Sequence, residues 1–105
     1  MAQEVTIDQL EQAIAQGATV IDVREADEFA SGHVPNAKHI ALNTVPDRIS
    51  EIPQGEQVWI ICQAGGRSMK AANYLEAQGF DVVSVAGGTG SWISAGKLVS
   101  FEESK

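Results

Sequence analysis

The clearest indication of the fold lies in residues 57–68, which read Gln57-Val58-Trp59-Ile60-Ile61-Cys62-Gln63-Ala64-Gly65-Gly66-Arg67-Ser68. The first half predicts a buried central strand over residues 57–62, because apolar side chains fall on both faces of an extended chain here. The two glycines favour a tight loop, and residues 67–78 then follow an amphipathic helical pattern that Gly79 closes. A buried strand that leads through a short loop into a helix is typical of a parallel α/β sheet.

The flanking sequence repeats this alternation of strand and helix. Runs rich in β-branched and apolar residues predict three further strands, at residues 18–23, 37–42 and 81–86. Thr6-Ile7-Asp8-Gln9 resembles a capping box, so a helix is expected to begin there and to stop at Gly17. Shorter helical segments are expected at residues 25–30, at residues 48–52 and after Gly87-Gly88. In a parallel sheet of this kind ligands bind beyond the carboxyl ends of the strands, which is where Cys62 falls.

Length and composition indicate a single folded domain. The chain has 105 residues, of which 44% are hydrophobic, and this is enough to bury a core without a disulfide or a structural metal. No internal repeat or linker interrupts it before the polar end at residues 102–105. We therefore expect one domain over residues 1–105 with a short polar tail.

The charge balance and the terminal sequence exclude several classes of protein. Fourteen acidic residues against seven basic ones give a net charge of −7, which repels nucleic acid and anionic membrane surfaces. The first residues lack the basic region and apolar run of a signal peptide, and the apolar stretches at 18–21 and 58–62 are too short to span a bilayer. We expect a cytoplasmic protein that binds neither nucleic acid nor membrane.

The metal-ligating residues are too few for a convincing zinc site. Cys62 is the only cysteine, so an internal disulfide is excluded, and His33 and His39 do not complete a plausible ligand set with it. Nothing in the sequence indicates a metal, a nucleotide or a flavin. We expect no cofactor.

Cys62 and the loop after it carry the candidate chemistry. A tight loop turns its backbone N–H groups inward, and the following helix adds the positive end of its dipole, so a thiolate at the base of the loop is stabilised. The pKa of such a cysteine can fall from about 8.5 to roughly 3.5–7.5, which makes it a nucleophile at neutral pH. The candidate catalytic residue is Cys62, and the candidate substrate-binding residues are Gln63, Ala64, Gly65, Gly66, Arg67 and Ser68.

A plainer interpretation of Cys62 competes with this one. A lone cysteine that ends an apolar strand is more often a small core residue than a reactive centre. The Gly65-Gly66 step between a strand and a helix favours the reactive interpretation. In the loop, Ser68 would donate a hydrogen bond to the sulfur, and Arg67 would draw an anionic donor toward the mouth.

Three segments together resemble the rhodanese family, and the resemblance covers nearly the whole chain. The first motif is Asp22-Val23-Arg24-Glu25 with Glu28-Phe29 and Gly32-His33-Val34-Pro35-Asn36-Ala37. The second is the loop from Cys62 to Ser68, and the third is Gly87-Gly88-Thr89-Gly90-Ser91-Trp92. The resemblance implies a rhodanese-like three-layer α/β/α fold with a five-stranded, mainly parallel central sheet. It also implies that sulfane sulfur is carried as a persulfide on Cys62.

The length of the loop separates this chain from related phosphatases. Dual-specificity phosphatases of the cell-cycle type share the fold, but their loop is one residue longer and places arginine six positions after cysteine. Here Arg67 follows Cys62 by five positions, which gives the smaller ring that suits sulfur. One small departure is Asn36, where many relatives have glycine, and asparagine tolerates the same left-handed backbone.

Several other polar residues have both a functional and a structural interpretation. Asp22 and Arg24 lie on the same face at the end of a strand, and we favour a structural ion pair over a role in site electrostatics. His33 is more plausible as a hydrogen-bond partner of the loop backbone than as a general base. Trp92 is interpreted as a core aromatic rather than a pocket wall.

Residues outside the motifs receive no functional assignment. We expect Trp59 to pack against a helix, and His39 has no functional case. Lys70 and Asn73, on the helix after the loop, are interpreted as solvated.

The leading hypothesis is a sulfurtransferase that moves sulfane sulfur from thiosulfate, a polysulfide or a persulfide to a thiol or cyanide through Cys62. Because Arg67 is the loop's single cation and the protein is acidic, persulfides or polysulfides are favoured slightly over thiosulfate. A sulfur relay that accepts persulfide from a partner protein uses the same cysteine. An inactive partner-binding domain and a thiol redox switch are two further hypotheses. The partners are a small-molecule sulfur donor and a thiol acceptor, and we expect a monomer or a weak homodimer.

Overall fold

The computed structural model describes residues 1–102, which contain a parallel sheet of five strands. The strands are β1 (Gln3–Val5), β2 (Thr19–Asp22), β3 (Lys38–His39), β4 (Val58–Ile61) and β5 (Val82–Val85). Their order across the sheet is β1-β5-β4-β2-β3, and each neighbouring pair is parallel. The α/β class and the parallel sheet predicted from the sequence are thereby confirmed.

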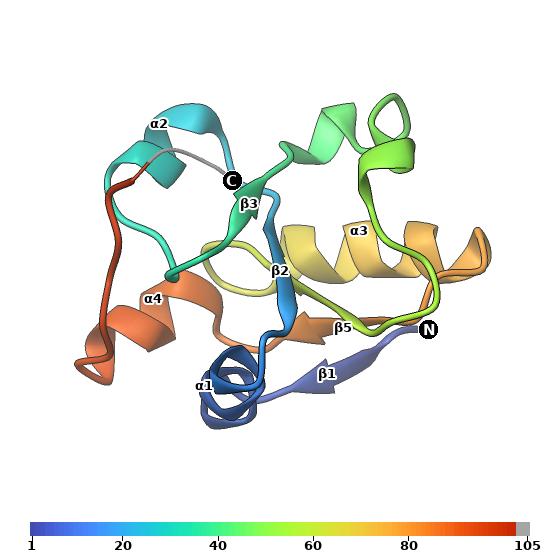
Figure 1. Ribbon diagram of the computed structural model, residues 1–105. Helices are drawn as coiled ribbons and strands as arrows, with labels where there is room; N and C mark the ends of the chain where they lie inside the picture. The colour runs from blue at the N-terminus through green and yellow to red at the C-terminus, as the bar shows by residue number, and fades with distance from the viewer. Residues whose placement is uncertain (103–105) are drawn as a thin grey trace.

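Helices cover both faces of this sheet (Figure 1). They are α1 (Ile7–Ala15), α2 (Ala26–Ala30), α3 (Gly66–Ala77) and α4 (Gly88–Ser94), with 3-10 turns η1 (Leu42–Thr44) and η2 (Ile49–Glu51). In Figure 1, α3 and the 3-10 turns lie on one side of the sheet, whereas α1 and α4 lie on the other. The core is correspondingly divided in two, and the sheet separates a cluster around Ile60 and Leu75 from one around Ile61 and Leu10. This is the predicted three-layer α/β/α arrangement.

The central strand β4 places the candidate nucleophile, Cys62, at the carboxyl-terminal end of the sheet. β4 pairs with β2 on one side and with β5 on the other, and Val58, Ile60 and Ile61 are all fully buried. Because the strands are parallel, their carboxyl ends meet at the same edge of the sheet. Cys62 therefore lies beside the residues that follow β2 and β5, far apart from it in the sequence.

Local sequence signals explain where the first helix begins. The Thr6 hydroxyl accepts the N–H of Gln9 at 3.1 Å, and the Gln9 side chain accepts the N–H of Thr6 at 2.8 Å. This reciprocal pair satisfies two backbone donors that the first turn of a helix leaves free. The predicted capping box is confirmed. Asn36 adopts the left-handed backbone expected of it, with φ at 69°.

Two predictions about strands were wrong. Residues 37–42 form only the two-residue strand β3, because after Ile40 donates to the Asp22 carbonyl the chain turns away and Leu42 donates to Val23 instead. Strand β1 was not predicted from the local pattern, because its burial is confined to Val5 and its pairing partner, β5, lies at the other end of the chain. The implied fifth strand is this one. Of the predicted polar tail, residues 103–105 lie outside the described residues.

The two residues interpreted as solvated differ in their surroundings. Lys70 is exposed, as expected. Asn73 is half-buried, and its side-chain oxygen accepts the N–H of Ala2 at 2.7 Å, so it ties the start of β1 to α3. The expectation for Asn73 was therefore wrong, because the amino terminus of the chain packs over this part of the helix.

Candidate active site

Cys62 lies at the base of the loop that joins β4 to α3. The residue is 1% exposed, and its Sγ accepts the N–H of Gly65 at 3.0 Å. Gly65 adopts a φ of 114°, a conformation that favours glycine, and this turn aims its N–H back at the sulfur. The sequence predicted this inward-facing amide, and the geometry agrees with it.

Competing effects act on the ionisation of the Cys62 thiol. Burial acts to raise its pKa, because it penalises the charged thiolate. Hydrogen bonds from the Ser68 hydroxyl and from the amides of Ser68, Gly65 and Ala64 act in the opposite direction and outweigh burial. The pKa of Cys62 is therefore lower than its ordinary value. Positively charged side chains contribute less to this lowering of the pKa than these neutral donors do.

Two buried hydroxyl groups form a hydrogen-bonded chain that ends at the sulfur of Cys62. Ser68 Oγ lies 3.4 Å from Cys62 Sγ and 2.8 Å from Ser84 Oγ, and it also donates to the Gly65 carbonyl at 3.1 Å. Ser68, in the first turn of α3, and Ser84, in β5, are both completely buried. The predicted contact between Ser68 and the sulfur is present, but with the thiol protonated Cys62 Sγ is the donor and Ser68 Oγ the acceptor, the reverse of the predicted direction. Ser84 was not predicted as part of the site.

Backbone N–H groups in the first turn of α4 donate hydrogen bonds to the backbone of the loop. Thr89 donates its N–H to the Cys62 carbonyl at 2.8 Å, and Gly90 donates to the Gln63 carbonyl at 3.0 Å. This approach is close because Gly88 has no side chain: a Cβ atom there would lie 2.4 Å from the Cys62 carbonyl oxygen. The absence of a side chain at Gly88 therefore allows the backbones of α4 and the loop to come close together. Trp92 is buried in the core, as expected, and donates its ring N–H to the Leu98 carbonyl.

The ion pair between Asp22 and Arg24 braces the loop from the other side. Both side chains are buried, and the guanidinium contacts both carboxylate oxygens at 2.8–3.1 Å. Arg24 also donates to the Gly32 carbonyl at 2.9 Å and to Gln63 Oε1 at 3.2 Å. The pair is structural, as we favoured, and it connects the segment after β2 to the second residue of the loop.

Arg67 forms an ion pair at the start of α3. Its guanidinium donates to the two carboxylate oxygens of Glu28 at 2.7 and 2.9 Å, a bidentate contact between α3 and α2. Arg67 and the N–H of Glu25 lower the pKa of Glu28 to about 2, so the ion pair is intact at neutral pH. That Arg67 draws an anionic donor toward the loop mouth stays a prediction, and in this structure its guanidinium is bound to Glu28.

The histidines bind backbone carbonyls. His33 Nδ1 lies 2.8 Å from the Phe29 carbonyl oxygen, and its ring stacks on the Phe29 ring at 3.6 Å between centroids. His39 Nε2 lies 2.7 Å from the Arg24 carbonyl oxygen. His33 thus makes the structural contact that its sequence context favoured. Both histidines help to fix the segment that carries Arg24 and Glu28.

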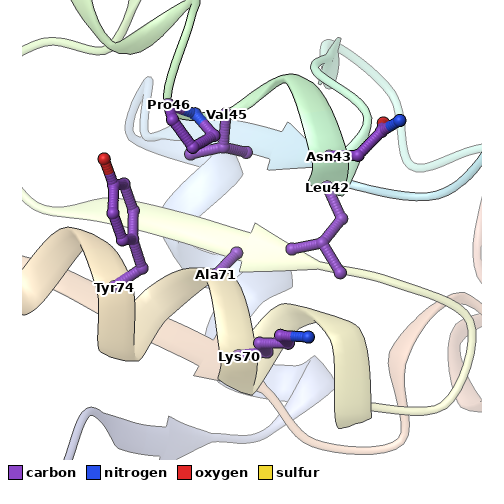
Figure 2. Close-up of a pocket in the computed structure, with 7 residues that line it drawn as sticks. All are labelled: Leu42, Asn43, Val45, Pro46, Lys70, Ala71 and Tyr74. Carbon is purple, nitrogen blue, oxygen red and sulfur yellow. The ribbon is translucent and has the colours of Figure 1, made fainter.

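An apolar pocket of about 280 Å³ opens between η1 and α3, beside the loop. Figure 2 shows the residues that line it, which are Leu42, Asn43, Val45, Pro46, Lys70, Ala71 and Tyr74. Cys62 is not among them. The pocket is therefore separate from the immediate surroundings of the reactive sulfur.

Within residues 1–102, no group of three or more His, Cys, Asp or Glu side chains is arranged to hold a metal ion. Every helix in this part of the chain is too short or too polar to span a bilayer.

The fold thus brings the sequence-predicted residues Cys62, Gly65 and Ser68 together and adds partners that the sequence did not identify. Glu28 was noted only as part of a motif, although its opposite charge to Arg67 is a usable signal once α2 and α3 are known to be neighbours. Ser84 lies in an apolar strand with no signal of its own. Thr89 and Gly90 contribute backbone atoms, which sequence does not distinguish.

Comparison with known proteins gives a consistent result. A family model described as a rhodanese-like domain matches residues 6–95. The chain is 34% identical to a sulfurtransferase of Allochromatium vinosum over 91% of this chain and 92% of that protein. It is 40% identical to the thiosulfate sulfurtransferase GlpE of Pseudomonas savastanoi pv. phaseolicola over 73% of this chain and 74% of that one. A solved structure of a rhodanese-related protein from Thermoplasma volcanium superposes with a TM-score of 0.90, at 30% identity, over 95% of this chain and 99% of the other.

Proposed function

This chain belongs to the rhodanese-like domain family and is a sulfurtransferase, and from that premise we propose that Cys62 carries the transferred sulfur as a persulfide. The observation that supports this most directly is the hydrogen bond from the Gly65 amide to Cys62 Sγ, together with the lowered pKa of the thiol. A buried sulfur that is held by neutral donors is an anion site, and a thiolate is the reactive form of cysteine.

The proposed cycle has two displacement steps. The Cys62 thiolate first attacks the outer sulfur of a donor. With thiosulfate, the S–S bond of the donor breaks, sulfite leaves with the bonding electrons, and Cys62 becomes a persulfide. An acceptor thiolate or cyanide then attacks the outer sulfur of that persulfide, and the second S–S bond breaks to regenerate the Cys62 thiolate. Atoms and charge balance in each step, and no redox partner is consumed.

The loop residues have distinct proposed roles in this cycle. The amides of Ala64, Gly65 and Ser68 and the Ser68 hydroxyl stabilise negative charge on sulfur. Gln63 links the loop to Arg24, and Gly66 begins α3, whose dipole points its positive end at the site. Because α2, α4 and the central strands all meet this loop, we treat residues 1–105 as one functional domain.

The donor and acceptor follow from the chemistry of the site. Thiosulfate, polysulfides and small persulfides all present an outer sulfur to a nucleophile, and the names of several relatives make thiosulfate one of the donors to test. The acceptor is a small thiol or cyanide, and a protein persulfide can replace the small donor. We further propose a cytoplasmic location, where a reducing environment keeps a lone thiol available between turnovers.

Mass spectrometry of the intact protein tests the persulfide. After incubation with thiosulfate or with a small persulfide, the wild type is expected to gain the mass of one sulfur atom, and cyanide is expected to remove it. Cys62→Ala should show no gain with either donor, whereas Ser94→Ala, a substitution at an exposed position, should gain sulfur like the wild type. A folded and reduced wild type that gains no sulfur from any donor would make the chain a partner-binding domain instead.

The same assay separates an enzyme from a relay. If small donors load Cys62 slowly but a protein persulfide loads it rapidly, the chain is a relay. If small donors turn over many times with cyanide as the acceptor, it is an enzyme that acts on small molecules.

A further inference from the structure

We infer that Glu28 sets the donor preference of this site by neutralising Arg67, so that persulfides are accepted in preference to thiosulfate. This inference rests on the proposed persulfide chemistry of Cys62 and assigns a specificity-determining role to a residue of α2. Three arguments support it: the geometry of the ion pair between Glu28 and Arg67, the charged side chains around this pair, and the negative charges carried by thiosulfate and by a persulfide when Cys62 attacks them.

The ion pair lies at the partly exposed junction between the loop and α3, which we take as the entrance for donors. Arg67 is in the first turn of α3, directly after the loop, and its guanidinium is held by both oxygens of Glu28. The side chains are 36% and 31% exposed, so the pair faces solvent rather than the core. Arg67 is also close enough to Cys62 for a negative charge on the sulfur to act on the guanidinium.

Two carboxylates act on Arg67 and offset its positive charge. Glu28 pairs with the guanidinium, and Glu25 contributes a second negative charge close to it. Arg24 acts on Glu28 from the interior, but it is buried and paired with Asp22. A bidentate Arg–carboxylate contact is geometrically specific, and an incoming sulfonate would have to displace Glu28 to use the same donors.

The two donors place very different demands on this entrance. Attack of the Cys62 thiolate on thiosulfate brings a monoanion and a dianion together, and sulfite leaves as a dianion. Attack on a persulfide involves one negative charge when the donor is R–S–SH and two when it is R–S–S⁻, because the S–S bond breaks and R–S⁻ leaves. Like charges repel unless a cation offsets them, so a neutralised Arg67 penalises thiosulfate, with three negative charges in total, more than it penalises a persulfide.

The substitution Glu28→Gln tests this inference. Glutamine keeps an oxygen that can accept the N–H of Glu25, as Glu28 does at 2.9 Å, so the start of α2 is preserved. The matched control is Asp27→Asn, which removes one negative charge from the same helix, at a residue that makes no ion pair or hydrogen bond with Arg67 in the described structure. Each protein is assayed for sulfur transfer to cyanide, with thiosulfate and with 2-hydroxyethyl persulfide, a donor that carries no other charge.

We expect the KM for thiosulfate to fall by roughly three- to tenfold in E28Q, a range typical of one partly exposed charge contact. The KM for 2-hydroxyethyl persulfide should change by less than about twofold, since that donor does not need the cation. In D27N both values should stay close to those of the wild type. In the double variant E28Q/R67Q the KM for thiosulfate should return to about the wild-type value, because the cation released by E28Q is absent.

Several results would overturn the inference. One is a KM for thiosulfate that is unchanged in E28Q, and another is an equal fall of this KM in D27N. A third is a fall of this KM that persists in E28Q/R67Q, which would point to the exposed Lys70 as the cation. Turnover with 2-hydroxyethyl persulfide shows in the same sample that E28Q is folded, and Glu28→Ala provides a second release of Arg67. Failure of the proposed function is distinct, because then the wild type forms no Cys62 adduct with either donor.

Discussion

At the scale of single residues, the Cys62 thiol is activated mainly by neutral hydrogen-bonding groups. The largest contributions that lower its pKa come from a hydroxyl and backbone amides, and the Arg67 guanidinium, whose charge also acts on Cys62, is bound to Glu28. Neutral donors that are fixed in place stabilise a thiolate without attracting a permanent counterion into the loop. The same donors remain available when the charge moves outward onto the second sulfur of a persulfide.

Ser84 is predicted to tune this activation, although it does not touch the sulfur. Its hydroxyl lies 2.8 Å from Ser68 Oγ, so it orients the hydroxyl that faces Cys62. In Ser84→Ala we expect the pKa of Cys62 to rise, because the hydroxyl that faces the sulfur loses the partner that orients it. The measurement is the pH dependence of alkylation by iodoacetamide, whose midpoint should move to higher pH.

The ionisation of Cys62 should make the free energy of unfolding depend on pH. Because the pKa of folded Cys62 is below its ordinary value, the stabilisation is fully present above the unfolded pKa and is lost as pH falls through the folded pKa. In S84A the loss should start at the same pH as in the wild type, be complete at a higher pH and be smaller in total, because only the folded-state pKa of Cys62 rises. Ser94→Ala, at an exposed position of α4, should leave the alkylation midpoint where it is, and an unchanged midpoint in S84A would contradict the role of Ser84.

At the scale of elements, α4 determines where the loop backbone lies. The two carbonyls at the base of the loop accept N–H groups from the first turn of α4. In Gly88→Ala the new Cβ would lie 2.4 Å from the Cys62 carbonyl oxygen. We expect the free energy of unfolding to fall by about 2–4 kcal/mol and sulfur transfer to slow by roughly ten- to a hundredfold.

Gly17→Ala is the matched control for this substitution. Gly17 also has a positive φ, 86°, but nothing lies within 4 Å of the position of its Cβ. Gly17→Ala should lower the free energy of unfolding by about 1–2 kcal/mol, because alanine disfavours the left-handed backbone there, and it should leave the rate of sulfur transfer unchanged. Chemical denaturation and the cyanide assay measure both effects. Equal losses of stability and activity in the two variants would show that contact with the loop is unimportant.

Elements with local signals were the ones that could be predicted from sequence. The capping box of Thr6, the buried strand before Cys62 and the helix after Gly65 each depend on neighbouring residues. Strand β1 depends instead on a partner at the other end of the chain, and the short β3 depends on where the chain leaves the edge of the sheet. Their lengths are set by tertiary pairing, which local propensity does not encode.

The candidate site divides in the same way. Cys62, Gly65 and Ser68 were predicted because one contiguous loop contains them. Glu28 and Ser84 reach the loop from α2 and β5, and the ion pair of Glu28 with Arg67 was not predicted from the sequence. A charged side chain can be identified from sequence, but whether it is already paired depends on the fold.

At the scale of the whole molecule, the net charge of −7 is predicted to slow thiosulfate loading. A dianion approaching an acidic protein is repelled at long range, and salt screens this repulsion over about 10 Å at 0.1 M. Between about 10 mM and about 300 mM NaCl we expect the rate of Cys62 persulfide formation from thiosulfate to rise by roughly two- to fivefold. Intact-protein mass spectrometry at short times measures it.

Alkylation of Cys62 by iodoacetamide, a neutral reagent, is the control for this prediction. Its rate should stay constant over the same range of salt, because no charge is brought to the site. A thiosulfate rate that falls with salt would mean that a local positive charge, and not the overall acidic field, dominates the approach.

The pairing of β1 with β5 bears on how the chain acquires its structure during synthesis. Residues at the amino end complete the sheet only with a strand that is made near the carboxyl end, so part of the folding barrier is the closure of a very long loop. The amides of Thr89 and Gly90, which hold the base of the reactive loop, also emerge from the ribosome after that strand. A nascent chain therefore contains its only thiol well before it contains the amides that hold the base of the reactive loop.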